Sequence, residues 1–261
     1  MPFSFSSSSI VFITGASRGY GQCLACLFAQ EFSRASPSSA KFVLTARSAE
    51  GLAKTKQLIH ELAPDVDVTV VAGDFKEISA SFIEKLFDSV SSSFDQALLI
   101  NNAGSLGNVS VSLSQQTDFG CVSEYFSLNV AAPIVLTSQF LKHFQSARGK
   151  YVVNISSLCA IEPFESFGLY CAGKAARDMA SRVLAKETSD VRVLNWAPGP
   201  MDTEMTQRAA DESQSDRTRK LFGDMKKEQK YVPLEDSVQK LILLLAKDEF
   251  ESGIHLDFYD V

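Results

Sequence analysis

The sequence predicts an α/β protein built on one doubly wound parallel sheet of about seven strands, with helices on both faces. Two observations carry this prediction. Short β-branched or apolar runs alternate with helix-compatible segments along the whole chain, as in parallel strands joined by helical crossovers. Residues with polar or reactive side chains repeatedly follow the ends of these runs, and such sheets bind ligands at the carboxyl ends of their strands.

The composition fits one globular domain across residues 1–261. Hydrophobic residues make up 45% and charged residues 21%, which can fill a sizeable core. A net charge of −6, without a Lys/Arg cluster, argues against a nucleic-acid partner. The N-terminus lacks a basic segment followed by a long apolar one, and the apolar run 241–246 is too short to span a bilayer. We therefore expect a cytoplasmic protein without a membrane partner.

The cysteines agree with that compartment. Five cysteines are an odd number in a chain long enough to fold without disulfides, which favours a reducing environment. Cys23 and Cys26 form a C-x-x-C pattern inside an apolar helical segment, with no second Cys or His pair nearby. Core packing is the favoured interpretation of that pair, and we expect no metal site.

The first predicted strand, residues 10–14, is followed by a glycine-rich turn and by a helix at 22–32. This order is the context of a dinucleotide-binding turn, because glycines let the backbone approach a pyrophosphate and the helix N-terminus offers free N–H groups. The spacing is G-x-x-x-G-x-G rather than G-x-G-x-x-G, so the turn does not define the site alone. The predicted contacts are Gly15, Ala16, Ser17, Arg18, Gly19, Tyr20 and Gly21.

The second strand, residues 41–46, predicts which dinucleotide binds. An NAD site usually carries an acid at this strand end, whereas here Arg47 and Ser48 follow the strand. Together with Arg18, they suit a ribose 2′-phosphate, because guanidinium groups pair with phosphate oxygens. We therefore favour NADP(H), with two solvated surface arginines as the alternative.

A helix at 49–62, a strand at 66–73, a helix at 78–90 and a strand at 97–100 follow. Asp74, at the end of the third strand, could accept a hydrogen bond from an adenine amino group. Capping the next helix is an equally good reason for an acid there.

The fourth strand ends in Asn101-Asn102-Ala103-Gly104, where small residues would admit a flat ring and the Asn amides would tie neighbouring strands together. A long helical stretch then covers 118–143, and Pro133 predicts a bend or junction within it. Asn129 is unfavourable inside a helix, because asparagine has a low helix propensity. It could hold a water or a backbone carbonyl near Lys174, or it could be a satisfied core amide.

The strand 151–155 leads to Ser157, and a helix-compatible segment carries Tyr170 and Lys174 one turn apart on the same face. A hydroxyl, a phenol and an ammonium are the parts needed to hand a proton to a carbonyl oxygen. The lysine charge would bring the phenol pKa closer to working pH, and Ser157 would hold the carbonyl. A packed tyrosine beside a solvated lysine is the alternative, so the prediction depends on the accompanying motifs.

The strand 191–197 ends in a Pro-Gly-Pro turn, and a helix at 234–246 and a last strand at 253–259 complete the chain. Between them, residues 203–231 are polar and charged, which is typical of a mobile substrate lid.

Taken together, these motifs resemble the short-chain dehydrogenase/reductase family over residues 10–205, and so predict a Rossmann-type fold. The resemblance implies that Tyr170 donates the proton and that Ser157 orients the carbonyl. It further implies that Lys174 binds the nicotinamide ribose and lowers the Tyr170 pKa, and that Asn129 supports a proton relay through water. The residues that carry it are Thr14, Gly15, Gly19, Gly21, Asn101, Asn102, Ala103, Gly104, Asn129, Ser157, Tyr170, Lys174, Pro198 and Gly199.

A closer resemblance, to the pterin-reducing branch of the family, runs through 154–160, 169–179 and 191–200 to the tail 255–260. It implies an NADPH-dependent reduction of pterin side-chain ketones, at the last stage of tetrahydrobiopterin synthesis, by a cytosolic homodimer. An Asp at the position of Asp257 would anchor the pterin, whose amino group and ring N–H form a donor pair for a carboxylate. Trp196 and Phe167 replace other aromatics and could reshape the pocket wall.

The resemblance also implies further contacts. For the cofactor they are Phe75, Pro198, Met201, Asp202, Thr203, Met205 and Thr206. For the substrate they are Leu106, Phe167, Cys171, Gly199 and Met205, beside Ser157, Tyr170 and Asp257. The nearest alternative function is a general carbonyl or diketone reductase. A redox-sensing protein that holds NADP(H) without catalysis would predict damage to the Ser-Tyr-Lys group, which is intact.

Overall fold

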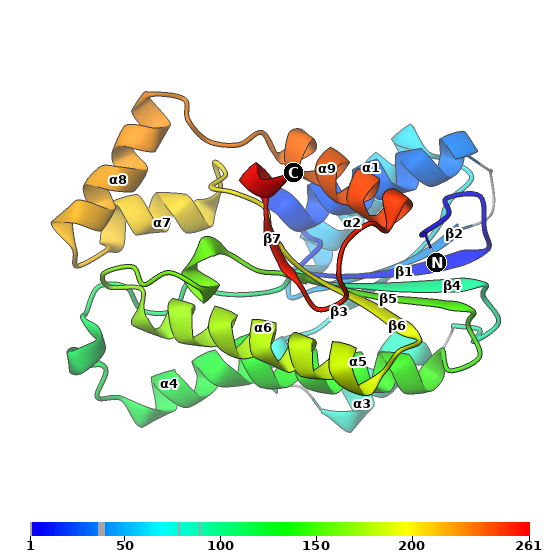
Figure 1. Cartoon of the computed structure of the whole chain (residues 1–261), viewed down its shortest axis with the longest axis horizontal. Helices are drawn as coiled ribbons and strands as arrows, with labels where there is room; N and C mark the ends of the chain where they lie inside the picture. Colours follow the sequence, from blue (N-terminus) through cyan, green and yellow to red (C-terminus); the bar gives the residue numbers. More distant parts are fainter. Residues whose placement is uncertain (1, 36–39, 78, 89) are drawn as a thin grey trace.

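The computed structural model describes residues 2–35, 40–77, 79–88 and 90–261, and within them seven strands form one parallel sheet (Figure 1). The strand order is β3-β2-β1-β4-β5-β6-β7, so the chain winds outward from β1 in one direction and from β4 in the other. Every neighbouring pair is parallel, which confirms the predicted doubly wound sheet. The strands are β1 Ser9–Thr14, β2 Ala40–Ala46, β3 Asp67–Ala72, β4 Gln96–Asn101, β5 Gly149–Ile155, β6 Val191–Ala197 and β7 His255–Asp257.

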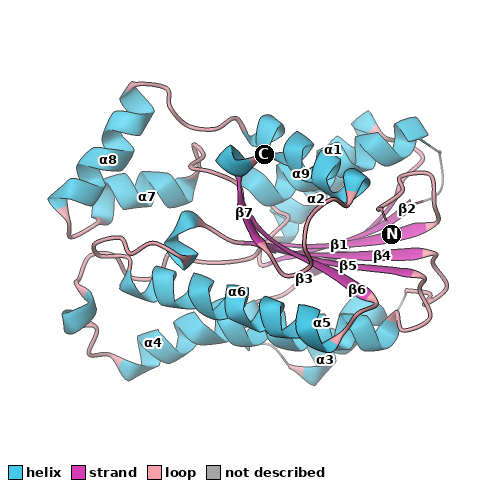
Figure 2. Cartoon of the chain, viewed as in Figure 1, coloured by secondary structure: helices cyan, strands magenta, loops and turns pink. Residues whose placement is uncertain are grey.

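Helices cover both faces of the sheet (Figure 2). One layer holds α1 Gly19–Ala35, α2 Ala49–Leu62 and α9 Leu234–Lys247. The other holds α3 Ala80–Phe87, α5 Ala132–His143 and α6 Gly168–Glu187, with α4 Phe119–Phe126 leading into α5. Two further helices, α7 Glu204–Glu212 and α8 Asp216–Lys227, stand beyond the carboxyl ends of the strands, where the predicted lid lies.

The alternation of side chains along β1 builds two separate cores. Val11 and Ile13 pack into the apolar cluster shared with α1 and α9, whereas Ile10 and Phe12 pack into the cluster shared with α3 and α5. All four are buried, because a parallel strand covered by helices on both sides is apolar on both faces. The sheet is therefore a rigid platform that fixes where its strand ends lie.

The long helical stretch 119–143 contains the predicted junction. A π-helical turn, Ser127–Ala131, separates α4 from α5, and Pro133 lies in the first turn of α5, where its missing N–H costs little. Among the described residues, Phe119–His143 is the one helical stretch with the length and apolar composition of a membrane span. Of its most apolar window 28% is buried, and α5 contributes the buried Leu136 and Phe140 to the core.

Several elements differ from their predicted limits. Helix α1 is longer at both ends than the predicted 22–32, and β5 begins at Gly149, two residues before its predicted start. Strand β7 covers three residues and not 253–259, because the Asp257 carboxylate accepts the Tyr259 N–H and starts a 3₁₀ turn over Phe258–Asp260. The predicted helix 78–90 is seen as α3, and residues 78 and 89 lie outside the described residues.

Candidate active site

Three side chains with acid–base potential meet where β5 and α6 approach each other. Ser157 follows β5, and Tyr170 and Lys174 lie one turn apart on the buried face of α6. The Ser157 hydroxyl lies near that of Tyr170 and acts to lower its pKa. The Lys174 Nζ lies 5.4 Å from the centre of the Tyr170 ring and donates to the Ile155 carbonyl at 2.6 Å. The predicted grouping of these three residues is therefore present.

Their electrostatics differ from the expectation. Burial raises the pKa of Tyr170, and the nearby Ser157 hydroxyl only partly opposes this effect. Burial, helped by the charge of Arg177, lowers the pKa of Lys174 to about 7. The expected net lowering of the phenol pKa is therefore not seen, because loss of solvent around Tyr170 outweighs the interactions that favour the phenolate. Tyr170 is held as a neutral phenol, which is the form that can donate a proton.

The glycine turn between β1 and α1 is shaped by contact with the loop after β4. Gly15 and Gly19 have positive φ angles of 68° and 54°, which favour glycine. A Cβ at Gly21 would lie 2.2 Å from the Gly15 carbonyl oxygen, so only hydrogen fits there. A Cβ at Gly19 would meet nothing within 4 Å, so this part of the turn faces open space at the N-terminus of α1. A dinucleotide pyrophosphate fits this cradle and its free N–H groups.

The polar residues that were predicted to contact the cofactor surround this cradle. Arg47 and Ser48 are exposed after β2, and the Ser48 hydroxyl caps α2 by accepting from Gly51 N. Arg18 is also exposed and forms an ion pair with Glu204 at the start of α7. Asp74 accepts from the Lys76 N–H at 3.0 Å within the 3₁₀ turn Phe75–Glu77, whereas the next helix, α3, is capped by Ser79, so the capping role considered for Asp74 is not seen. The charges available to a 2′-phosphate are therefore on the surface, where that of Arg18 also pairs with Glu204.

The Asn residues after β4 connect the parts of the site. Asn102 donates from its amide to the Thr14 and Gly15 carbonyls, tying β4 to the glycine turn as predicted. Asn129, in the π-helical turn, accepts from the Ser105 N–H at 2.8 Å and donates to the Tyr125 carbonyl at 2.9 Å. Its side chain is thus bonded within the chain, as in the second of the two interpretations, but these contacts use only one of its two amide hydrogens.

An apolar pocket wall lies on the other side of Tyr170. Leu106, Phe167 and Tyr170 are buried in one cluster, against which Cys171 and Met205 pack. The Phe167 ring meets Tyr170 edge-on and stacks on Phe222 of α8. The predicted lid helices therefore contribute apolar side chains to this wall, although their sequence is mostly polar.

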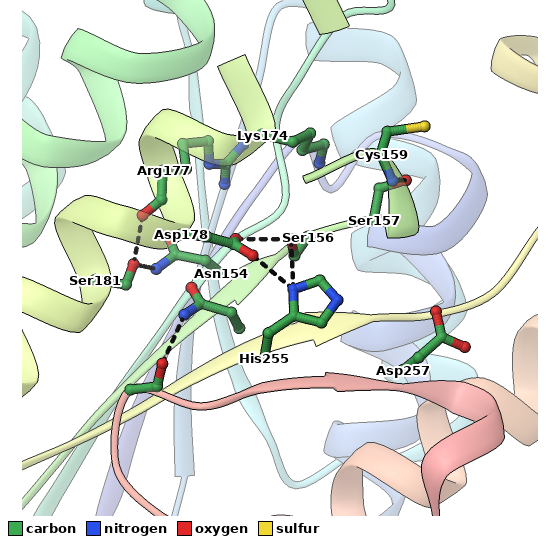
Figure 3. Close-up of polar contacts among 12 residues, drawn as sticks. Asn154, Ser156, Ser157, Cys159, Lys174, Arg177, Asp178, Ser181, His255 and Asp257 are labelled. Carbon is green, nitrogen blue, oxygen red and sulfur yellow. Dashed lines mark hydrogen bonds and ion pairs between the residues drawn. The ribbon is translucent and has the colours of Figure 1, made fainter. Parts of the chain in front are cut away.

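Asp257 is brought to the site by the pairing of the last two strands. It stands opposite Ala197 in the register of β6 and β7, next to the turn that contains Gly199 with its positive φ. Figure 3 shows Asp257 apart from the hydrogen-bonded residues of the sheet end, on the side of Ser157 and Cys159. It is half-buried, so its carboxylate remains accessible.

The other predicted contacts occupy the same end of the sheet. Pro198 is buried after β6, Thr203 caps α7, and Thr206 donates to the Met201 carbonyl at 2.7 Å. The remaining predicted contacts differ in burial. Ala16, Phe75 and Asn101 are buried, Ser17, Ala103 and Met205 are half-buried, and Gly104 and Asp202 are exposed.

Two aromatic residues have other places than predicted. Trp196 is fully buried in the core and donates from Nε1 to the Tyr20 hydroxyl, so it does not shape the pocket wall. Tyr20 also bonds Ser237 of α9, which leaves only its backbone for a cofactor. In β6, Leu194 and Trp196 pack into the core shared with α1 and α9, whereas Val191 and Val193 pack with Val152 in a separate cluster, and the side of Trp196 could not be assigned from its sequence neighbours.

Sequence reasoning missed a buried polar group beside Lys174 (Figure 3). The Asp178 carboxylate accepts from Ser156 at 2.7 Å and lies 2.6 Å from the Nδ1 of His255, which joins α6, β5 and β7. Arg177 donates to the Asn101 and Ala103 carbonyls and holds the loop after β4 against α6. The available signal was the spacing of Arg177 and Asp178, which follow Lys174 at three and four residues on a buried helix face.

Comparison with known proteins agrees with this geometry. The sequence profile of a family described as short chain dehydrogenase matches residues 9–214. The sepiapterin reductase of Mus musculus is 41% identical over 259 residues, covering 97% of both chains. A benzil reductase ((S)-benzoin forming) of Bacillus cereus is 30% identical over 255 residues, covering 93% of this chain and 96% of its own. The crystal structure of levodione reductase has the same fold, with a TM-score of 0.82 at 22% identity, covering 97% of this chain and 96% of that one.

Proposed function

Because the chain belongs to the short-chain dehydrogenase family, we propose that it is an NADP(H)-dependent oxidoreductase that reduces side-chain ketones of pterins. The substrates would be sepiapterin, giving dihydrobiopterin, and 6-pyruvoyl-tetrahydropterin, giving tetrahydrobiopterin. The observation that carries the proposal is the intact Ser157–Tyr170–Lys174 group at the sheet end, with the Asp257 carboxylate at the end of β7, two strands from β5. The similarity to sepiapterin reductases extends along nearly the whole chain.

The glycine cradle, the N-terminus of α1 and the loop after β4 would hold the dinucleotide. Arg18 and Arg47, exposed beside the cradle, support NADP(H) over NAD(H), because a 2′-phosphate would add a charge-assisted partner for each guanidinium. Bound NADPH supplies the hydride that the carbonyl carbon receives.

The chain's own residues supply the proton and the positioning. Tyr170, kept neutral by burial, donates its O–H proton to the carbonyl oxygen as charge develops on it. Ser157, beside Tyr170, would direct its hydroxyl at the same oxygen and hold it near the proton donor. Lys174, whose pKa lies at about 7, adds a partial positive charge behind Tyr170 that stabilises the phenolate left after transfer. A proton relay through water near Asn129 would return the proton to Tyr170.

Asp257 would select a pterin. Its carboxylate, half-buried at the end of β7, offers two oxygens to the adjacent amino and ring N–H donors of the ring. Leu106, Phe167, Cys171 and Met205 would pack on the flat ring and place the side-chain ketone beside Tyr170. Residues 203–231, which form α7 and α8, would act as the lid of this pocket within a single domain.

The homodimer is supported by an apolar groove between α5 and α6. The groove measures about 320 Å³ and is lined mostly by small and apolar residues, among them Ile134, Val183 and Leu184. Ile134 on α5 and Val183 on α6 are 45% and 46% exposed, and Met179, also on α6, is 54% exposed. Pairing with a second copy would bury this surface, as expected for side chains of that size. A Val183→Asp substitution should then convert a dimer to a monomer in light scattering after gel filtration.

A cytoplasmic location is supported by the cysteines, since all five are free thiols. The similarity to a benzil reductase favours one second candidate, a general diketone reductase on the same scaffold.

The two candidates differ in what Asp257 should do. Asp257→Ala should raise the KM for sepiapterin about tenfold or more, and leave the KM for benzil nearly unchanged, because only the pterin has donors for the carboxylate. Tyr170→Phe should keep NADPH affinity and lose about 10²–10⁴-fold in kcat on both substrates. An unchanged KM for sepiapterin in Asp257→Ala would favour the diketone reductase, and full turnover in Tyr170→Phe would exclude the proposed mechanism.

A further inference from the structure

The candidate pterin anchor, Asp257, lies on a part of the sheet with little intrinsic support. Strand β7 forms one edge of the sheet, covers three residues and pairs with β6 alone in the described sheet. Each of residues 255–261, which we call the β7 segment, is half-buried or exposed. So short an edge strand has few ladder hydrogen bonds and little buried apolar surface to fix its position. Contacts of side chains must therefore hold Asp257 in place.

The side chains of the β7 segment alternate between the two faces of the sheet. Leu256 and Phe258 pack against the core shared with α1 and α9. His255 and Asp257 therefore project to the opposite face, which α6 covers, and Figure 3 shows both on the same side of the strand. There the Nδ1 of His255 lies 2.6 Å from the Asp178 carboxylate of α6. This contact, two residues before Asp257, links its strand to the helix that carries the proposed proton donor.

The Asp178 carboxylate is a firmly held partner for this contact. It is buried on α6 and accepts a hydrogen bond from the Ser156 hydroxyl at 2.7 Å. A buried carboxylate needs hydrogen-bond donors, because it has lost those of water. An ionised carboxylate only accepts, so the Nδ1 of His255 carries the hydrogen and the bond is charge-assisted. Moving His255 away would leave the buried carboxylate with one donor fewer.

Ser156, Asp178 and His255 are the residue types of a hydrolytic triad, but their arrangement excludes that chemistry. In such a triad the serine contacts one ring nitrogen of the histidine and the acid contacts the other. Here Ser156 donates to Asp178, and the same Nδ1 of His255 faces both residues, at 3.5 Å and 2.6 Å. Among the described residues, the buried Nε2 of His255 has no hydrogen-bond partner. The group therefore connects elements of the fold and does not attack a substrate.

A second contact holds the β7 segment just after Asp257. Lys240 of α9 donates from its Nζ to the Phe258 carbonyl at 2.8 Å and to the main-chain oxygen of Val261. The same Nζ lies 4.0 Å from the centre of the Phe258 ring, within the range of a cation–π contact. Between the two anchors, the Asp257 carboxylate accepts from the Tyr259 N–H at 3.1 Å, which orients that side chain. The segment is thus held on both sides of Asp257, from opposite faces of the sheet.

We propose that His255 and Lys240 are positioning residues that hold the Asp257 carboxylate at the pocket and thereby determine selectivity for pterins. His255 ties Asp257 to α6, so the substrate anchor and the proton donor keep a fixed separation. The role in selectivity rests on the proposed function, whereas the anchoring of the segment does not. A small diketone has no hydrogen-bond donor for Asp257, so its binding does not depend on either anchor.

Hydrogen exchange of the full-length protein tests the anchoring without any substrate. His255→Leu and His255→Asn form a matched pair, because their side chains have the same size and branching but only asparagine can donate to Asp178. We expect the amides of 255–261 to exchange about fivefold faster in His255→Leu than in the parent, and near the parent rate in His255→Asn.

The second anchor has its own variant and control. Lys240→Met should speed exchange of the β7 segment like His255→Leu, and Lys247→Met, at an exposed position of the same helix, should not. Lys240 is half-buried on the outside of α9, so its variant provides the test even if His255→Leu does not fold. Unchanged exchange of the segment in Lys240→Met, and in a folded His255→Leu protein, would overturn the proposal.

Steady-state kinetics with NADPH test the effect on selectivity. His255→Leu should raise the KM for sepiapterin about fivefold, with kcat near the parent value and the KM for benzil unchanged. His255→Asn should restore the KM for sepiapterin. In the Asp257→Ala background, His255→Leu should raise this KM no further, because it acts through that carboxylate. The same fold-increase in both backgrounds would overturn the positioning role.

The two measurements separate the anchoring from the proposed function. A parent protein that does not reduce sepiapterin would refute the proposed function, and hydrogen exchange would still decide whether His255 and Lys240 hold the β7 segment. Faster exchange in His255→Leu, with an unchanged KM for sepiapterin in a protein that reduces it, would overturn the role in selectivity and leave the pterin reductase standing.

Discussion

Replacing Lys174 by Met should make the cofactor-free protein more stable at neutral pH while removing its activity. The Lys174 ammonium is buried, and the lowering of its pKa from 10.5 to about 7 measures the penalty for keeping the charge inside. That shift corresponds to roughly 5 kcal/mol in favour of the neutral form. The variant also loses the hydrogen bond to the Ile155 carbonyl, which offsets about 1–2 kcal/mol. A net gain on the order of 3 kcal/mol remains.

The pH dependence of this gain identifies its origin. Between about pH 7 and pH 10.5, the unfolded chain binds a proton at Lys174 that the native protein has released. The stability of the parent therefore rises with pH across this window, and that of the variant does not. The advantage of Lys174→Met should be about 8 °C in melting temperature near pH 7, and it should shrink steadily toward pH 10.

Calorimetry or fluorescence-monitored melting across this pH range measures the effect. Lys186→Met is the matched control, because Lys186 lies on the same helix but is exposed, and it should change stability little at any pH. A less stable Lys174→Met protein at pH 7, or a gain that does not vary with pH, would refute the reasoning.

Two further predictions concern the cradle and the buried polar group. Gly21→Ala should weaken NADPH binding about tenfold or more in a fluorescence titration, since its Cβ would lie 2.2 Å from the Gly15 oxygen; unchanged affinity would mean that the turn adapts without cost. Asp178→Asn should move the alkaline limb of the turnover profile to lower pH, because the Asp178 charge raises the pKa of Lys174 and its removal lets that pKa fall; an unmoved limb would separate Asp178 from Lys174.

The strands and their end motifs were predictable because they depend on local pattern. The run before Gly15 and the run before Asn101 read as strands, and both end where predicted to within one residue. The junction near Pro133 was also foreseen, because proline removes a helical hydrogen bond wherever the helix packs. Parallel pairing then brings their ends together, so the outline of the site followed from the sequence.

The predictions that failed concern properties that depend on how deeply a side chain is buried. The electrostatics of Tyr170 and Lys174 follow from near-complete burial, which spacing along a helix does not reveal. Trp196 was expected at the pocket wall, but it lies in the core because its neighbours across the sheet are apolar. Similarly, the contact between Asp178 and His255 joins residues far apart in the chain, and no local pattern encodes it.

NADPH oxidation with sepiapterin, run beside benzil and beside NADH, tests the central proposal most directly. We predict strong turnover with sepiapterin and NADPH, and much weaker turnover when NADH replaces NADPH. Turnover of benzil alone would contradict pterin specificity. It would preserve the chemistry of Ser157, Tyr170 and Lys174, and it would leave Asp257 without a role in substrate binding.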